Sequence, residues 1–594
     1  MLKVSTRDNM FKKLSKFIGE YKLPTIITPI LVALEVIMEV LIPLVMADLI
    51  DKGIYAGEMS TVYKLGLQLV ILALFSLCFG ATNGFTAAKA SAGFAKNLRR
   101  GLYHKVQDFS FANIDKFSTA SLVTRLTTDV SNVQQAFQML TRIMVRAPFM
   151  SIVAFIAAMK INASLAIIFV AIIPVLAFAI FKIISKAHKI IQATFRKYDK
   201  LNNVVEENVN SMRVVKSFVL EDEETEKFEE VSETICNNFI TADKRMALMP
   251  VVMDTAVYTC VLLVAWLGAK IIVVQNSEAI ANGTAALTPG ELMTLISYSI
   301  QILISLMMVS MCSLMLTTAK ASADRIVEVL DEESDIKNPE NAVTEVKDGS
   351  IEFNNVSFSY VNDKERLCLK DIDIKIKSGE TIGIIGGTGS GKSTLVNLIS
   401  RLYDVTEGSV KVGGVDVREY DLTTLRSEVA MVLQKNVLFS GTIKENLRWG
   451  DENATDEDIM RVCKLAQADE FIQGFPDKYD TYIEQGGTNV SGGQKQRLCI
   501  ARALLKKPKV LILDDSTSAV DTKTDAMIRT AFREEIPNTT KLIIAQRINS
   551  IEDADKIIVL DDGMINGFGT HEELLKTNAI YKEVYESQMK GSES

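Results

Sequence analysis

The first half of the chain contains long apolar stretches separated by charged segments. A helix needs about 20 mostly apolar residues to cross the hydrocarbon core of a membrane, which is about 30 Å thick. The pattern predicts six spans, at residues 24–49, 65–85, 143–159, 161–181, 248–274 and 292–318. The second, fourth and sixth of these carry no charged residue. A large buried helical core is the alternative, and it is disfavoured because core helices rarely run this long without a charge.

The placement of Lys and Arg predicts how the spans are oriented, because cytoplasmic flanks carry an excess of these residues. The leading segment 11–22 (FKKLSKFIGEYK) contains four lysines and predicts an amphipathic helix on the inner membrane surface, with a frayed soluble helix as the alternative. The long loops after the second and fourth spans are rich in Lys and Arg, whereas residues 275–287 contain neither. We therefore expect a multi-pass protein of the cell (plasma) membrane whose N- and C-termini and two long loops are cytoplasmic.

Both long loops have a helical composition, with few Gly and almost no Pro. The simplest geometry is a pair of helices that continue past the bilayer and turn back. We place the two turns near residues 114–118 and 214–220.

The second half of the chain has a different pattern. From residue 351 onward, short β-rich runs alternate with helical patterns, and the runs are IEFNNVSF, TIGIIG, VLILDD, LIIAQ and KIIVL. This alternation predicts an α/β domain with a largely parallel core sheet. We expect an amphipathic entry helix in residues 1–23, a six-helix transmembrane domain in 24–330, a polar linker in 331–349 and the α/β domain in 350–594.

Composition removes several classes of function. The chain has 65 Lys and Arg against 73 Asp and Glu, a net charge of −8, and a dedicated nucleic-acid binder would normally show a basic excess. Seven cysteines without a CxxC pair, together with only three histidines, argue against a disulfide framework and a zinc site.

Residues 386–393 (GGTGSGKS) match the phosphate-binding pattern G-x-x-x-x-G-K-[ST]. An apolar run precedes them and a helical run follows, which is the strand–loop–helix context that the pattern needs. Backbone N–H groups of such a loop hold phosphate oxygens at a helix N-terminus. Lys392 would reach the β- and γ-phosphates, and Ser393 would bind Mg²⁺. The predicted ATP-binding residues of this loop are Gly386, Gly387, Thr388, Gly389, Ser390, Gly391, Lys392, Ser393 and Thr394.

Other motifs accompany this loop. Asp514 ends the buried-strand run VLILD and is the expected partner of Mg²⁺ through its water shell. Gln434 ends the strand-like run AMVLQ, SGGQ occupies residues 491–494, and SAVD occupies residues 518–521. Their order and spacing over residues 351–587 resemble those of the ABC transporter superfamily. The six spans in front resemble its exporter branch, in which the transmembrane and nucleotide-binding domains share one polypeptide.

The resemblance implies ATP and Mg²⁺ as cofactors and an ATPase coupled to transmembrane movement. It implies that Tyr360 stacks on adenine, with a plain strand aromatic as the alternative, and that Gln434 contacts Mg²⁺ or water and senses the transmembrane domain. Ser393, Gln434 and Asp514 would form the metal site. Asp521 would cross a dimer interface. The signature residues Ser491, Gly492, Gly493 and Gln494 would serve the P-loop of the opposite domain.

Two positions depart from the family pattern. The residue after the Mg²⁺ aspartate is normally Glu, the base that polarises the attacking water, and here it is Asp515. Its carboxylate would fall about 1 Å short, and a misplacement of about 1 Å can cost on the order of 10²-fold in rate. The switch position is normally His, and here it is the uncharged Gln546. Either change alone is compatible with neutral drift, but together they predict a P-loop site that binds ATP and hydrolyses it poorly.

The intact signature predicts a partner. A homodimer would hold two impaired sites, so we expect a heterodimer whose second chain carries the usual Glu and His. This arrangement resembles bacterial heterodimeric multidrug-type exporters, with the homodimer as the alternative.

The transported compound is specified only weakly. Glu35 and Glu39 lie four residues apart on one face of the first span, and Asp254 lies in the fifth. Ionisable groups at membrane depth often mark a pathway, although Glu35 and Glu39 could instead pair with Arg142 or Arg146. Met307, Met308, Met311 and Met315 suit varied apolar ligands or simple packing. We expect export of small lipophilic compounds, which include drugs (the xenobiotic class) and cations. The alternatives are a lipid exporter, a peptide exporter, and a non-pumping ABC channel or sensor.

Overall fold

The computed structural model describes residues 10–275, 287–361, 363–515 and 520–592. The chain forms two compact units. The first consists of Met1–Gln107 and Ala120–Glu332, and the second of Asp108–Thr119 and Glu333–Ser594. The second unit therefore includes a short segment that interrupts the first unit in the sequence.

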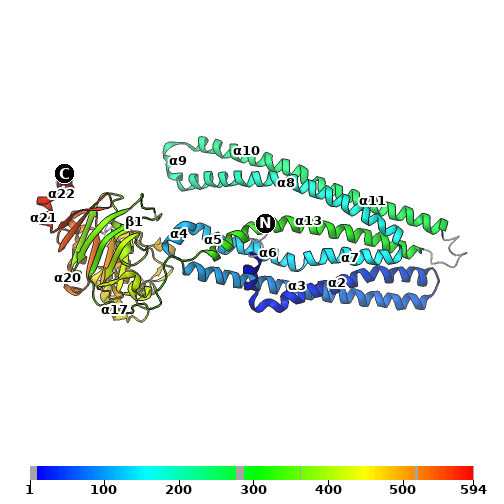
Figure 1. Cartoon of the computed structure of the whole chain (residues 1–594), viewed down its shortest axis with the longest axis horizontal. Helices are drawn as coiled ribbons and strands as arrows, with labels where there is room; N and C mark the ends of the chain where they lie inside the picture. Colours follow the sequence, from blue (N-terminus) through cyan, green and yellow to red (C-terminus); the bar gives the residue numbers. More distant parts are fainter. Residues whose placement is uncertain (1–9, 276–286, 362, 516–519, 593–594) are drawn as a thin grey trace. The chain divides into compact units, whose positions relative to one another are not determined.

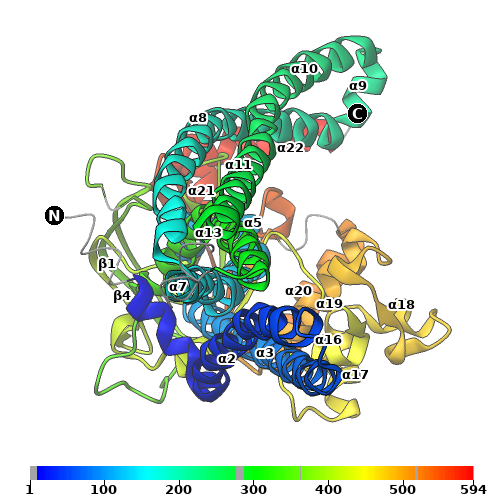
Figure 2. The same ribbon diagram turned by 90° about the vertical axis from the view of Figure 1, so that its right-hand side faces the viewer.

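The first unit is helical throughout its described part (Figure 1). Its elements are η1 (Lys16–Tyr21), α2 (Lys22–Asp48), η2 (Leu49–Ile54), α3 (Met59–Gln107), α5 (Thr119–Thr124), η3 (Arg125–Asp129), α6 (Val130–Thr141), α7 (Ile143–Ile161), α8 (Ala163–Asn210), α9 (Met212–Phe218), α10 (Glu221–Met246), α11 (Leu248–Lys270), η4 (Ile271–Gln275) and α13 (Pro289–Asp331). Helices α2 and α3 pack side by side, and α9 joins α8 to α10 where these two helices run next to each other (Figures 1 and 2).

Six helical segments of the described chain are long and apolar enough to cross a membrane. They are Met10–Ile54, Met59–Gln107, Thr119–Ile161, Ala163–Ala187, Glu221–Val273 and Pro289–Asp331. Several extend well beyond the roughly 20 residues that a bilayer needs, so the helices project past the membrane. The predicted turn at 114–118 coincides with α4 (Phe111–Phe117), and the one at 214–220 overlaps α9.

Local sequence explains where several of these helices begin. Thr288 caps α13 by accepting a hydrogen bond from the Glu291 backbone N–H, and the Glu291 carboxylate accepts one from the Thr288 backbone N–H. Pro289 occupies the first turn. The extended residue Asn162 ends α7 and caps α8 by accepting from the Leu165 backbone. Ile161, predicted to open the fourth span, therefore belongs to the helix before it.

The leading segment differs from its prediction. Residues 11–22 do not form one continuous amphipathic helix, because Gly19 has φ 51° and ψ −122° inside the 3₁₀ segment η1. This backbone conformation interrupts helical hydrogen bonding and is open to glycine because glycine has no Cβ. Here a Cβ would lie 2.9 Å from Asn97 Nδ2, so α3 also packs closely against the break.

The described residues of the second unit form three sheets and the helices that cover them (Figure 1). Its elements are α4, β1 (Ile351–Phe358), β2 (Leu369–Ile376), β3 (Thr381–Gly386), α14 (Lys392–Ile399), β4 (Glu407–Val412), β5 (Val415–Asp416), η5 (Val417–Glu419), α15 (Leu422–Glu428), β6 (Val429–Val432), β7 (Gly441–Thr442), α16 (Ile443–Leu447), α17 (Asp456–Leu465), α18 (Asp469–Gln473), η6 (Lys478–Asp480), β8 (Tyr482–Ile483), η7 (Gln485–Gly487), α19 (Gly492–Leu505), β9 (Val510–Asp514), α20 (Thr522–Glu535), β10 (Thr540–Ile544), η8 (Ile548–Ser550), β11 (Lys556–Asp561), β12 (Met564–Gly569), α21 (His571–Thr577) and α22 (Ala579–Ser592).

The central sheet has the strand order β12-β11-β3-β10-β9-β6. Its strands are parallel except β12, which pairs antiparallel with β11. Alternate residues of one strand enter different cores, because side chains alternate across a sheet. In β9, Leu511 and Leu513 join the core with α17, α19 and α20, whereas Val510 and Ile512 join the core with α14 and the antiparallel sheet. The sheet is therefore the middle of three layers.

The structure adds detail to two sequence expectations for this unit. The run IEFNNVSF does not join the parallel sheet; as β1 it forms the order β2-β1-β4-β5, in which every pairing is antiparallel. Within residues 333–349, Val343 pairs with Tyr420 and Val346 is 1% exposed. These apolar residues pack this part of the predicted linker against the α/β unit.

Candidate functional site

The phosphate-binding loop connects β3 to α14, as its pattern requires. Gly389 and Gly391 adopt φ 82° and 95°, a region that favours glycine. At Gly391 a Cβ would also lie 2.8 Å from Leu369 Cδ2 and 3.0 Å from the Cys368 carbonyl oxygen. The loop can therefore keep this tight curve only with glycine there, and the curve leads into the N-terminus of α14, where backbone N–H groups favour an anion.

Lys392 lies across its own loop. Its Nζ donates to the carbonyl oxygens of Gly386 at 3.0 Å and of Gly387 at 2.7 Å. Burial lowers the pKa of Lys392, while the charges of Asp514 and Asp515 act in the opposite direction. A phosphate group would offer the ammonium a stronger, charge-assisted acceptor than these carbonyls.

Ser393 and Asp514 face each other, with the serine Oγ donating to Asp514 Oδ1 at 3.1 Å. Burial raises the pKa of Asp514; the Ser393 hydrogen bond lowers it and the neighbouring Asp515 charge raises it. A divalent cation would offset this burial, since a hydroxyl and a carboxylate are oxygen ligands that Mg²⁺ accepts. Ser390 Oγ is buried without a hydrogen-bond partner among the described residues. The residues present therefore fit a Mg²⁺-bound phosphate chain, whose phosphorus centre would supply the reacting group.

The two positions that depart from the family pattern touch each other. Asp515 follows β9 directly, with φ 48°, and Gln546 lies two residues beyond β10. The Gln546 Nε2 donates to Asp515 Oδ2 at 2.7 Å. Gln588 of α22 fixes this loop by donating to the Gln546 carbonyl oxygen at 2.8 Å.

These groups line one cavity of about 770 Å³. The predicted residues on its wall are Tyr360, Gly386, Gly387, Thr388, Gly389, Gly391, Lys392, Ser393, Thr394, Gln434, Asp514, Asp515 and Gln546. Ile580, Tyr581 and Val584 of α22 also line it, and the sequence patterns gave no indication of these three.

The signature residues lie elsewhere in the described chain. Ser491 caps α19 by accepting from the Gln494 backbone, and Gln494 Oε1 accepts in return from the Ser491 backbone. Gly492 and Gly493 form the first turn, and Ser491 and Gly492 are exposed. None of them is among the described residues that line the cavity. Asp521 caps α20 at another exposed position, and Ser518 and Ala519 of the SAVD motif lie outside the described residues.

Tyr360 connects the cavity to Tyr403, which the sequence did not indicate, and through Tyr403 to α4. Its side chain is 46% exposed, and its hydroxyl lies 3.0 Å from Thr394 Oγ1. The ring of Tyr403 meets that of Tyr360 edge-on, with centroids 5.1 Å apart. The Tyr403 hydroxyl in turn donates to Asp115 Oδ2 of α4 at 2.9 Å.

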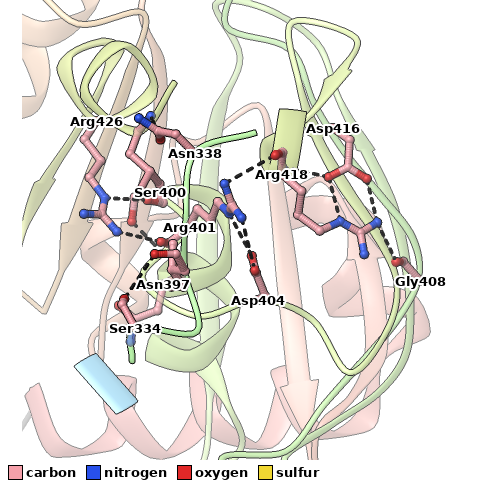
Figure 3. A network of polar contacts seen from close by, with 12 residues as sticks. Ser334, Asn338, Asn397, Ser400, Arg401, Asp404, Gly408, Asp416, Arg418 and Arg426 are labelled. Atoms are coloured by element: carbon pink, nitrogen blue, oxygen red, sulfur yellow. Dashed lines mark hydrogen bonds and ion pairs between the residues drawn. The ribbon is translucent and has the colours of Figure 1, made fainter. Parts of the chain in front are cut away.

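The loop that carries Tyr403 is held by arginines (Figure 3). Arg401, with φ 50°, contacts both carboxylate oxygens of Asp404, through Nε at 2.9 Å and Nη2 at 3.3 Å. Arg426 donates to the carbonyl oxygens of Ser400 and Arg401. Because this loop directly follows α14, it fixes Tyr403 between α4 and the aromatic wall of the cavity.

The membrane-domain acids have two different environments. Arg146 binds Glu35 and Glu39, with its closest contact to each at 2.7 Å, so the pairing that the sequence left open is present for Arg146. Asp254 is exposed on α11. In the methionine group, Met307, Met308 and Met311 are exposed.

Comparisons with known proteins now give the family. The model of the ABC transporter transmembrane region matches residues 25–307, and that of the ABC transporter domain matches residues 369–518. The chain is 37% identical to the uncharacterized ABC transporter ATP-binding protein YfiB of Bacillus subtilis, over 98% of this chain and 100% of the relative. The chain belongs to the ABC transporters. It is thus a multi-pass membrane protein of a family whose ATPase domain drives transport.

Two further similarities refine this picture. An ATP-dependent lipid A-core flippase of Desulfotalea psychrophila is 32% identical over 98% of this chain and 100% of its own length. The solved structure of a bacterial Atm1-family ABC exporter with ATP bound superimposes with a TM-score of 0.77 at 22% identity, over 95% of this chain and 98% of that one. The chain thus has an exporter fold, with a six-helix transmembrane domain and an ABC domain in one half-transporter.

Proposed function

We propose that this chain is one subunit of a heterodimeric ATP-driven exporter for small lipophilic compounds, with drugs as the foremost candidates. Its own P-loop site binds ATP with Mg²⁺ and hydrolyses it slowly, and its signature motif completes the active site of the partner chain. Residues 24–330 form the transmembrane domain between an entry segment in 1–23 and a connection in 331–349, and residues 350–594 bind nucleotide. Both termini lie on the cytoplasmic side of the plasma membrane.

The observation that carries this proposal is the contact between Asp515 and Gln546. Phosphoryl transfer needs a water in line with the γ-phosphate and electrostatic stabilisation as charge develops. The shorter Asp515 side chain is engaged by an amide, and Gln546 brings no positive charge to replace that of a protonated His. Both changes weaken the same step, while Lys392, Ser393 and Asp514 retain what ATP and Mg²⁺ binding require.

The partner follows from the signature. Ser491 and Gly492 are exposed at the N-terminus of a long helix, where backbone N–H groups favour an anion. They lie outside the cavity of their own P-loop, which supports a role opposite the P-loop of a second chain. ABC exporters work as dimers, and a partner with Glu and His would give this pair one competent site.

A lipid is the second candidate for the cargo, and the similarity to the lipid A-core flippase favours it. A peptide and a channel function have no comparable support.

The test uses the complex purified from its native membrane and reconstituted in liposomes. We expect ATP hydrolysis at about one site per dimer, stimulated by the cargo, and accumulation of a lipophilic dye against its gradient. Stimulation and movement of a labelled lipid A without dye transport would select the lipid instead. Conductance without uphill movement of either compound would contradict an exporter.

A further inference from the structure

Helices α2, α7 and α13 line a second, open cavity, of about 390 Å³, within the first unit. Its walls combine one acid, one base and two uncharged polar side chains with an apolar majority. The lining residues are Glu39, Ile42, Pro43, Arg146, Ala147, Met150, Gln301, Ile304, Ser305 and Met308.

Arg146 of the wall binds two acids, Glu39 of the wall and Glu35, which is not a lining residue, and the charges of this group do not cancel. Arg146 donates from Nη1 to Glu35 and from Nη2 to both oxygens of Glu39, at 2.7 and 2.9 Å. The remaining oxygen of Glu35 accepts from Asn83 Nδ2. All four carboxylate oxygens therefore act as acceptors, which fits two ionised carboxylates. One guanidinium neutralises only one of them, so the group retains a net negative charge.

Two buried oxygens at or near this cavity accept no hydrogen bond from the described residues, and they also favour a ligand with donors. Gln301 Oε1, on the cavity wall, is buried and accepts no hydrogen bond from the described residues. The same holds for Oδ1 of Asn83, a residue that is 0% exposed and bound to Glu35. Both atoms are acceptors, and a buried acceptor without a donor costs about 1–3 kcal/mol. A ligand that brings N–H donors would remove such a cost at Gln301.

The rest of the wall suits an apolar body. Ile304 and Met308 are partly exposed next to the buried Met150, and methionine adapts to ligands of different shape. Hydrogen bonds hold the helices that carry this wall together. The hydroxyls of Ser151 and Ser305, 2.5 Å apart, join α7 to α13. Tyr298 likewise donates from α13 to the Val40 carbonyl oxygen of α2 at 2.7 Å.

We propose that this cavity is a subsite for organic cations that carry N–H groups on an apolar ring system. The cationic N–H groups lie against Glu39 and Gln301 Oε1, and the ring system lies against Ile304 and Met308. This inference rests on the proposed export function and specifies its substrate class. An anionic head group is the poorer fit, because Arg146 already serves two carboxylates and a phosphate would have to displace them.

The experiment compares two dyes that differ in one charge. Rhodamine 6G is an ester with net charge +1, and rhodamine 19 is its zwitterionic free acid with the same ring and N–H groups. Binding to the full-length complex in neutral-lipid nanodiscs is followed by fluorescence polarisation without nucleotide, with empty nanodiscs subtracted. The variants are Glu39→Gln and Gln301→Leu. Glu58→Gln is the matched control, since Glu58 is exposed and bonds Thr61 away from this cavity.

We expect the wild type to bind rhodamine 6G more tightly than rhodamine 19, and Glu39→Gln to weaken rhodamine 6G about tenfold, the equivalent of about 1.4 kcal/mol. Gln301→Leu should weaken it severalfold, and Glu58→Gln should not change it. Equal binding of the two dyes, or unchanged rhodamine 6G binding in both cavity variants, would overturn the subsite. The dye comparison uses the wild type, so it stands even if a variant does not fold. ATP-driven transport of a neutral or anionic compound, with no cation preference, would reject the subsite and leave the exporter proposal intact.

Discussion

Gln546 Nε2 donates to Asp515 Oδ2 at 2.7 Å, which joins the two residues that depart from the ABC pattern at the hydrolysis site. The contact follows from the sheet. Strands β9 and β10 are parallel neighbours with Ile544 opposite Asp514, so the residues just beyond their ends lie side by side. The carboxylate at the position of the catalytic base is therefore held by an amide of its own chain.

The first prediction concerns this pair. Asp515→Ala should change the ATPase rate of the complex by less than about twofold, because a base placed about 1 Å from its optimum has already lost most of its effect. The measurement is steady-state phosphate release from the reconstituted complex. Changing the Glu of the partner at the corresponding position is the control, and it should stop turnover.

The opposite result would be a fast ATPase of this chain purified alone that disappears in Asp515→Ala. Asp515 would then be a working base, and the homodimer would be the functional form.

The nucleotide site illustrates what local sequence can predict. The P-loop was predictable because its glycines, Lys392 and Ser393 are adjacent in the chain and the strand and helix around them have clear patterns. Gln434, two residues beyond β6, and Asp514, the last residue of β9, were predictable together because parallel strands present their carboxyl ends at one edge of the sheet. The six spans were predictable because the hydrocarbon core imposes a length and a polarity on each helix.

Other features depend on contacts between distant residues. Asp115 and Tyr403 are 288 positions apart, and the pattern around each is that of an ordinary polar turn. The sequence shows only a tyrosine four residues after the helix that follows the P-loop. Glu35 and Glu39 pair with Arg146 rather than Arg142 because of how α7 is rotated about its axis relative to α2. A hydropathy pattern does not specify this rotation. Likewise, the pattern of β1 did not indicate that it pairs antiparallel with β2 and β4, because a run of strand residues does not specify its neighbours.

The second prediction concerns Lys392. Lys392→Ala should weaken ATP binding at this chain's site at least about tenfold, because the phosphate would lose its charge-assisted contact to the ammonium. Labelled ATP should titrate one tight site fewer per complex. Lys375→Ala is the matched control, since Lys375 is an exposed lysine of β2 that pairs only weakly with Glu352, at 3.9 Å. Unchanged stoichiometry and affinity in Lys392→Ala would mean that nucleotide is held elsewhere.

The third prediction separates the fold of the signature from its function. Ser491→Asp should preserve helix α19, because aspartate caps a helix as well as serine does. It should also place a negative charge where the phosphate of the partner's ATP is expected, so the ATPase of the complex should fall at least about tenfold through like-charge repulsion. Thermal unfolding and phosphate release are measured on the same sample.

Thr570→Asp makes the matched change at the cap of α21, which lies outside the signature, and activity should persist there. Loss of activity together with a lower melting temperature in Ser491→Asp would indicate a structural defect. Full activity with a normal melting temperature would place the competent site away from Ser491.

The last prediction concerns the link between α4 and the nucleotide cavity. Tyr403→Phe removes the hydrogen bond to Asp115 and keeps the ring that meets Tyr360. The affinity for ATP should therefore stay within about twofold of the wild type. Stimulation of the ATPase by the cargo should fall about fivefold, the equivalent of about 1 kcal/mol. Asp115→Asn retains an acceptor and should have a smaller effect. Tyr420→Phe is the contrasting control, because its buried hydroxyl donates to the Val412 carbonyl oxygen and its loss should lower the melting temperature without reducing stimulation. If Tyr403→Phe and Tyr420→Phe behave alike, the Tyr403 hydroxyl only stabilises the fold. If Tyr403→Phe loses stimulation and keeps its melting temperature, the bond to Asp115 transmits the state of the membrane helices to the wall of the nucleotide site.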